Sequence, residues 1–189
     1  MKRLNRCPWC GDDPVYVKYH DTQWGRPVKS EKKLFEFLTL ESAQAGLSWI
    51  TILKRRAAYA KAFAGFDVKK VAAFTGKDVN RLMKDKGIIR HRKKIEYAIL
   101  NAKLFIKTQK EFGSFKKYIE SFLPKGKPVI NNWKLITQIP ARTEISDAVS
   151  ADMKKRGFKF FGSVICYSFL QATGFVDDHL NNCFVRTNK

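Results

Sequence analysis

Five side chains of the types that bind zinc lie near the two ends of the chain. Cys7, Cys10 and His20 are close to its beginning, and His179 and Cys183 stand four residues apart close to its end. A spacing of four places two side chains on one face of a helix or in one tight turn. A structural zinc site takes four ligands, so the five residues can supply a Cys2His2 set with one cysteine left over. Such a site would tie the two ends of the chain together.

Two other interpretations of these residues compete with zinc. Cys7 and Cys10 form a C-x-x-C pair in the stretch RCPWC, which in an intracellular protein can be a redox dithiol. A redox dithiol usually stands at the start of a helix that follows a strand, and nothing before Cys7 can form that strand. Ordinary buried thiols and surface histidines are the other alternative. Because two of the three histidines stand near cysteines, we favour zinc.

Aromatic side chains gather in the same N-terminal segment. Trp9, Tyr16, Tyr19 and Trp24 fall within sixteen residues that show too little periodicity for a core helix, and Trp49 follows. Aromatic residues on irregular backbone can simply fill space between helices. Together, however, they can also line a pocket whose ring faces attract a flat or cationic ligand.

One carboxylate falls on an apolar helical stripe. On a helix that begins near Ser30, Glu41 shares a face with Leu34, Leu38 and Ala45. Burial would raise the pKa of this carboxyl, which suits hydrogen bonding or acid–base work in a pocket. The alternative is a hidden ion pair with Arg or Lys.

The stretch NRLMKDKGIIRHRKKI, residues 80–95, predicts a helix, a tight turn at Gly87 and a second helix. Basic residues run from Arg90 to Lys94, and amide N–H groups at a helix start point toward anions. The hairpin therefore suits a phosphate, and the alternative is an ordinary hairpin with a solvated basic end.

Helical periods position these residues along most of the chain. We expect two helices within residues 30–64, separated by a turn near 43–48 at Gly46, and two more within 68–109. A short helix around 114–122, a connecting loop, a helix capped by Ser146 that ends at Gly157 and a last helix over about 161–173 complete the prediction. Strand-like alternation is absent from the sequence, so the predicted class is mostly α.

Composition narrows the class of partner. The chain has 189 residues and a formal net charge of +20, which favours binding to a polyanion, and nucleic acid is the leading candidate. A soluble protein whose surface is merely basic is the alternative that charge alone leaves open. Four scattered cysteines exclude the disulfide framework of a small secreted domain. No signal peptide and no membrane-spanning segment are visible, so we expect a cytoplasmic protein.

Several blocks of sequence occur together in one order: RCPWC through YHDTQWG, LESAQAGLSWITILKRR, KGIIRHRKKI, SDAVSADMKKRGFKFFG and ICYSFLQATGFVDDHLNNC. With these blocks, the chain resembles the 3-methyladenine DNA glycosylase I family of the helix-hairpin-helix superfamily. The resemblance extends from about residue 6 to residue 183. The resemblance implies an all-α helix-hairpin-helix DNA glycosylase fold in a single domain over 1–189. Its hairpin lobe would span about 30–115, and its second lobe would join about 1–29 to 116–189 through structural zinc.

The resemblance also implies roles for individual residues. The zinc ligands would be Cys7, His20, His179 and Cys183, and Glu41 would contact the damaged base. The pocket would be shaped by Trp9, Tyr16, Tyr19, Trp24 and Trp49. The wedge that fills the gap in the duplex would come from Gln44, Gly46 and Leu47, and the hairpin residues Gly87, Ile88, Ile89 and Arg90 would hold the DNA.

The expected activity is base-excision repair on double-stranded DNA that contains alkylated bases. The enzyme would flip alkylated adenine, chiefly 3-methyladenine, into the pocket and hydrolyse its N-glycosidic bond, working as a monomer without a lyase lysine. The competing class is a non-enzymatic basic DNA- or RNA-binding protein in which Glu41 and the aromatic residues are only core. A zinc-dependent or dithiol redox enzyme would require Cys10 to matter as much as Cys7.

Overall fold

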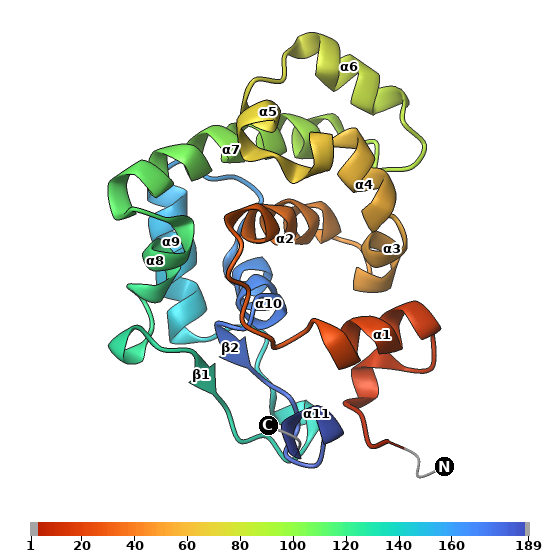
Figure 1. Ribbon diagram of the computed structural model, residues 1–189, viewed down its shortest axis with the longest axis vertical. Helices are drawn as coiled ribbons and strands as arrows, with labels where there is room; N and C mark the ends of the chain where they lie inside the picture. Colours follow the sequence, from red (N-terminus) through yellow and green to blue (C-terminus); the bar gives the residue numbers. More distant parts are fainter. Residues whose placement is uncertain (1–3, 188–189) are drawn as a thin grey trace.

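Helix α2, Glu31–Gln44, crosses the middle of the computed structural model, which describes residues 4–187 (Figure 1). Ser30 caps it, as the sequence predicts, because its hydroxyl oxygen accepts a hydrogen bond from the Lys33 N–H. Helix α7 packs against one side of α2 and α10 against another, so α2 is buried on most of its faces. Gly46, with a φ of +79°, makes the predicted turn after it.

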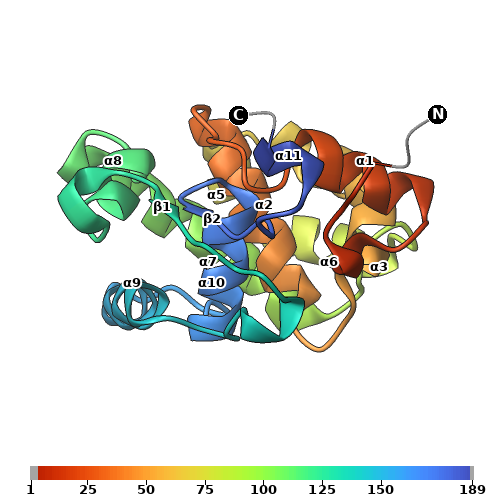
Figure 2. The same ribbon diagram turned by 90° about the horizontal axis from the view of Figure 1, so that it is seen from below.

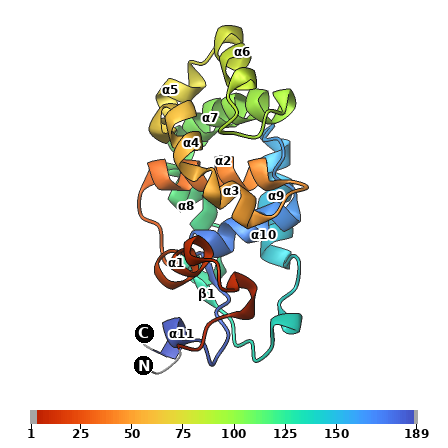
Figure 3. The same ribbon diagram turned by 90° about the vertical axis from the view of Figure 1, so that its right-hand side faces the viewer.

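The other helices surround α2. The first part of the chain forms α1 (Pro14–Thr22). After α2 come α3 (Trp49–Lys54), α4 (Arg56–Ala62), α5 (Val68–Ala72), α6 (Gly76–Lys84) and α7 (Arg92–Phe112). The C-terminal part forms α8 (Phe115–Glu120), α9 (Glu144–Lys155), α10 (Ser163–Ala172) and α11 (Phe184–Thr187). Figure 3 shows α4 to α7 stacked above α2, with α1 and α11 below it.

Three details of the prediction are wrong. Residues 14–22, expected to be irregular, form α1, because Asp13 accepts hydrogen bonds from the Val15 and Tyr16 N–H groups and Pro14 fits the first helical position. Thr143, and not Ser146, caps α9, and Ser146 stands three residues later in a reciprocal capping box. The three helices predicted after α2, one ending by residue 64 and two within 68–109, are five helices, since the chain breaks at Arg55 and again between α5 and α6.

The mostly helical class is confirmed, with one small addition. Two strands of two residues, β1 (Val129–Ile130) and β2 (Val176–Asp177), pair in parallel with Val129 opposite Val176. This pair holds the connecting loop against the segment that follows α10. The proposed division into two lobes stays a prediction.

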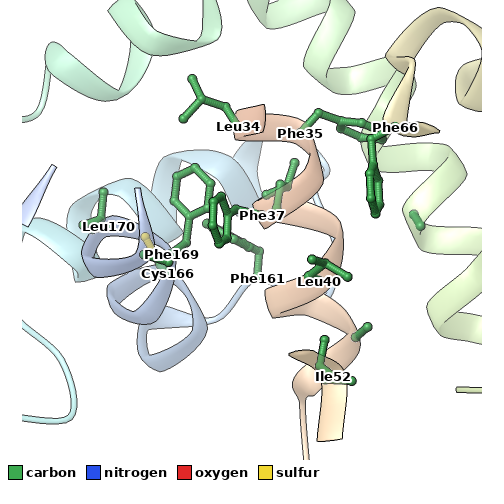
Figure 4. Close-up of a cluster of buried hydrophobic side chains, with 14 of the residues drawn as sticks. Leu34, Phe35, Phe37, Leu40, Ile52, Phe66, Phe161, Cys166, Phe169 and Leu170 are labelled. Atoms are coloured by element: carbon green, nitrogen blue, oxygen red, sulfur yellow. The ribbon is translucent and has the colours of Figure 1, made fainter. Parts of the chain in front are cut away.

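The core is one continuous cluster that runs through α2. Figure 4 shows Phe37 facing Phe161 and Phe169, while Phe35 faces Phe66 on another side of the helix. These side chains are at most 5% exposed, so each face of α2 is covered by a different part of the chain. Packing on several sides thereby holds α2 in a fixed position between the parts of the fold that carry the candidate site.

Helix α11 lies beside the N-terminal segment that leads into α1 (Figures 2 and 3). The Phe184 N–H donates to the Asn5 carbonyl at 2.8 Å, and the Leu180 N–H donates to Cys7 Sγ at 3.4 Å. Within residues 4–187, no helix has the length and apolar composition required to cross a bilayer.

Candidate active site

A cavity of about 260 Å³ opens between α1, α2, α3 and α10. Its walls contain all five aromatic residues selected from the sequence together with the selected carboxylate: Trp9, Tyr16, Tyr19, Trp24, Trp49 and Glu41. The cavity is small for a ligand site, and its walls are mainly apolar with a few polar groups. Its size and walls suit a single flat group of about the size of a nucleobase.

The aromatic side chains hold one another in place. Trp9 is central, with ring centroids 5.0 Å from Tyr16 and 4.8 Å from Trp24, both edge to face. The Tyr19 ring centroid lies 5.6 Å from that of Trp49. Such contacts fix ring orientation and leave the ring faces in the cavity wall available to a ligand. Trp9 and Tyr16 are half-buried, whereas the other three are at most 9% exposed.

Glu41 is buried in this wall without an ionic partner. It is 2% exposed, and its Oε2 atom has no hydrogen-bond partner within residues 4–187. The alternative of a hidden pair with Arg or Lys is therefore wrong for the part of the chain that the structure describes. Desolvation raises the pKa of Glu41 from its usual value near 4.5 to about 8. A cation in the pocket would favour the ionised form and lower this pKa.

Two further buried polar atoms in the wall are also unpaired. The indole Nε1 atoms of Trp9 and Trp49 have no hydrogen-bond partner among the described residues. Buried donors and acceptors are normally paired, and each exception calls for an explanation. The indole donors of Trp9 and Trp49 and the carboxyl of Glu41 beside one cavity give a ligand polar atoms with which to pair.

The sequence analysis missed four residues of the wall. Ser168 and Gln171 lie on α10, and Ile136 and Ile139 lie in and beside a short 3-10 helix, Ile136–Gln138. The two polar residues stand three apart within the apolar stretch SVICYSFLQA, and that spacing was the available signal. The isoleucines carry no local signal, because only the tertiary fold brings their loop to the pocket.

Asp178 fixes the orientation of Gln171. The Gln171 Nε2 amide donates to Asp178 Oδ2 at 2.7 Å, and this buried carboxylate also accepts from Tyr167, Trp133 and Asn131. A carboxylate oxygen repels the amide oxygen, so the NH2 group faces Asp178. The side-chain amide oxygen of Gln171, Oε1, is therefore the polar atom that is left to face the pocket.

The predicted metal ligands gather next to the pocket. The ligand atoms of Cys7, His20 and Cys183 all lie within 4.8 Å of one another, and all three residues are buried. The His179 ring lies with its centroid 5.1 Å from that of His20. Cys10 points elsewhere, because its thiol donates to the Cys7 carbonyl at 3.3 Å.

The donor chemistry of this cluster fits a metal. His20 Nδ1 lies 2.8 Å from Asp21 Oδ1 and His179 Nδ1 lies 2.7 Å from Asp177 Oδ1, the carboxylate support typical of metal-binding imidazoles. His179 Nε2 is buried with no hydrogen-bond partner among residues 4–187. A hydrogen bond from the Cys7 thiol lowers the pKa of Cys183, which favours the thiolate form that binds metals.

The cluster of cysteine and histidine side chains and the pocket share a wall. The Trp24 ring lies 4.6 Å from the His179 ring and 4.8 Å from the Trp9 ring, between the cluster and the cavity. Gly25, with a φ of +67°, packs so closely that a Cβ there would lie 2.7 Å from His179 Cε1. Changes at the cluster would thus reach the pocket through Trp24.

The turn predicted to be the wedge projects from the C-terminal end of α2. Gln44 lines the cavity, while Gly46 is exposed and Leu47 is 40% exposed. The Leu47 N–H donates to the Gln44 carbonyl at 2.6 Å, which closes the turn. An exposed leucine on a turn that follows a cavity-lining residue can insert between bases.

The hairpin lies between α6 and α7, as predicted, but Gly87 serves a different purpose. Its φ is not in the left-handed region, and a Cβ there would lie 2.7 Å from the Cβ of Ala58 on α4. Close packing against α4, rather than turn geometry, requires the glycine. The Ile89 N–H donates to the Tyr59 hydroxyl at 3.1 Å, Ile88 is buried, and Arg90 is exposed. Of the four hairpin residues, Arg90 is thus the one with an exposed cationic side chain.

Comparison with known proteins gives one family over nearly the whole chain. The profile of the methyladenine glycosylase family matches residues 9–186. The chain is 46% identical to the DNA-3-methyladenine glycosylase of Haemophilus influenzae, across 97% of this chain and 98% of the relative. It is 47% identical to DNA-3-methyladenine glycosylase 1 of Escherichia coli K12, across 95% and 96%. The crystal structure of a Tyr-to-Phe variant of a 3-methyladenine DNA glycosylase I in complex with 3-methyladenine matches with a TM-score of 0.93, 40% identity and coverage of 97% and 98%.

Proposed function

The chain belongs to the methyladenine glycosylase family, and we propose that Glu41 and the aromatic walls around it select and release the methylated base. The activity is that of a base-excision repair glycosylase for 3-methyladenine, an enzyme that hydrolyses an N-glycosidic bond. Family membership thus favours the enzyme over the non-enzymatic nucleic-acid-binding alternative. The observation that carries the proposed roles is the unpaired, buried carboxyl of Glu41 beside an aromatic cavity.

Selection begins when the base leaves the duplex. Unstacking and unpairing cost a few kcal/mol, and this cost is smallest for a damaged base that pairs badly. The exposed turn at Gly46 and Leu47 would fill the gap left behind, and the hairpin with Arg90 would hold the backbone. Both elements lie close to the pocket-forming end of α2.

The charge of the flipped base would decide which bases are kept. Adenine that is alkylated at N3 while still bonded to deoxyribose carries a positive charge, whereas normal adenine is neutral. Aromatic ring faces attract a desolvated cation by roughly 2 kcal/mol. Glu41 would add a charge-assisted hydrogen bond to the base, and it would lose its proton as the cation enters.

The same positive charge makes the base a good leaving group. When the glycosidic bond breaks, its electron pair moves to the base, which leaves neutral, and positive charge develops on the sugar. Water then adds to the sugar and loses a proton, so hydrolysis consumes one water. The residues of this chain would position the base and stabilise charge, and no lysine lines the pocket to act as a lyase nucleophile among the described residues.

We propose zinc as a structural cofactor held by Cys7, His20, His179 and Cys183. Two thiol and two imidazole ligands, each imidazole supported by a carboxylate, make a set that zinc prefers, and it would supply a cross-link between the chain ends. The unpaired His179 Nε2 supports this proposal. Cys10 stays outside the ligand set because its thiol donates to a backbone carbonyl.

The natural partner would be double-stranded DNA that contains alkylated bases. The net charge of +20 supports strong, salt-dependent attraction to the phosphate backbone. We infer that the enzyme acts as a monomer in the cytoplasm, where bacterial chromosomal DNA is found.

The variant Glu41→Gln tests the proposed role of the carboxylate. It keeps the shape of the side chain and removes its charge, so release of 3-methyladenine from alkylated DNA is expected to fall strongly while duplex binding persists. Glu144→Gln, an exposed residue of α9, is the matched control and is expected to retain full activity. Undiminished release by Glu41→Gln would show that Glu41 is not the selecting contact.

A further inference from the structure

Lys94 connects the hairpin to the wedge turn. It stands in the first turn of α7, directly after the hairpin, and its ammonium donates to the Ala43 carbonyl at 2.9 Å and to the Ala45 carbonyl at 2.6 Å. We propose that Lys94 is a positioning residue that fixes the wedge turn to the hairpin. The contact of the hairpin with the DNA backbone and the insertion of the wedge into the duplex are thereby aligned with each other. This inference rests on the proposed roles of the wedge turn and the hairpin.

The contact provides hydrogen-bond donors to backbone carbonyls at the C-terminal end of α2. The last carbonyls of a helix have no partner within the helix, and a cation there also interacts favourably with the helix dipole. Lys94 provides both effects at the end of α2. Three consecutive carbonyls are thereby held, because the Gln44 carbonyl between the two bonded to Lys94 accepts from the Leu47 N–H. The turn that carries Leu47 has little freedom left.

Lys94 is itself well anchored. Its backbone N–H donates to His91 Nδ1, which caps α7, and the next residue, Ile95, is 2% exposed. The adjacent Arg92 and Lys93 are exposed, whereas Lys94 is half-buried. Burial lowers the pKa of Lys94, consistent with an ammonium withdrawn from solvent. The sequence analysis counted Lys94 among the phosphate-binding cations, but its ammonium already faces protein carbonyls.

These contacts separate Lys94 from two other kinds of residue. A phosphate contact would raise DNA affinity in a salt-dependent way. A residue that only supports the pocket would affect the affinity for the free base. Lys94 touches the end of α2 on the wedge side and is not part of the cavity wall, so it would affect the step in which the base is extruded and held out of the duplex.

The test compares Lys94→Met with Lys103→Met, which removes the same charge from an exposed position farther along α7. Single-turnover release of 3-methyladenine from methylated duplex at saturating enzyme is expected to fall about 10- to 100-fold in Lys94→Met, the effect of misplacing a functional group by about 1 Å. Its affinity for free 3-methyladenine and the salt dependence of its duplex binding are expected to stay unchanged. Lys103→Met is expected to keep the saturated rate.

Conservative variants complete the design. Lys94→Arg keeps a cation with several donors and is expected to retain most of the wild-type rate, and Lys94→Gln, which keeps one donor, replaces Lys94→Met if that variant does not fold. A saturated rate in Lys94→Met equal to that of wild type overturns the positioning role, as does a parallel loss of free-base affinity. Absence of base release by the wild-type protein would instead refute the proposed function.

Discussion

Glu41 should cost the folded protein stability at alkaline pH. Its buried carboxyl has a pKa of about 8, compared with about 4.5 when exposed in the unfolded chain. Since one pKa unit corresponds to about 1.4 kcal/mol, the ionised carboxylate destabilises the free enzyme by up to about 5 kcal/mol relative to the neutral form. Glu41→Gln removes the ionisation and keeps the shape, so it is expected to stabilise the protein at high pH.

The sign follows from the protons bound in each state. Between pH 4.5 and about 8 the folded chain keeps the Glu41 proton while the unfolded chain loses it, so the free energy of unfolding falls as pH rises. Below this window Glu41 and glutamine are both neutral, and the two proteins are expected to be almost equally stable. Between pH 5 and pH 8 the advantage of the variant is expected to grow by about 4 kcal/mol.

Urea unfolding of the two proteins at pH 5, 6, 7 and 8 measures this difference directly. Other titrating groups are present in both proteins, so they cancel in the comparison. Glu144→Gln, whose carboxyl is exposed, is the control and is expected to follow the wild type at each pH. A stability difference between wild type and Glu41→Gln that does not change with pH would refute the desolvation argument.

Three further predictions follow from the same geometry. If ionised Glu41 binds the cationic base, kcat/KM for methylated duplex is expected to rise with pH up to about 8, and a flat profile would contradict this role. Purified protein is expected to contain about one zinc per chain in metal analysis. Cys7→Ser is expected to lose the zinc and to show a marked fall in Tm by calorimetry, whereas Cys10→Ser is expected to keep the zinc and the wild-type Tm. Gly87→Ala places a Cβ 2.7 Å from Ala58 Cβ, so it is expected to lower the free energy of unfolding in urea by about 1 to 3 kcal/mol and to weaken duplex binding. Wild-type values of both would show that the hairpin tolerates the methyl group.

Local signals in the sequence predicted the helices that depend on their own residues. Ser30 and Gly46 mark the two sides of α2, and Glu41 was recognised because it lies on the apolar stripe of that helix. The charge of the chain and its ordered blocks predicted the class of enzyme. Helix α1 was missed although Asp13 and Pro14 form a valid start signal, because its aromatic residues face a pocket rather than follow a core stripe.

The sequence by itself therefore determined the helical class, the basic surface and most of the chemical groups of the site. Only the tertiary structure decided that Ser168 and Gln171 line the same cavity as Glu41, and that Lys94 reaches the end of α2. Helix caps and hydrophobic periodicity involve residues only a few positions apart, so a short stretch of sequence is enough to reveal them. Contacts between segments fifty or more residues apart depend on how α2 is packed from several sides, and no local pattern encodes that packing.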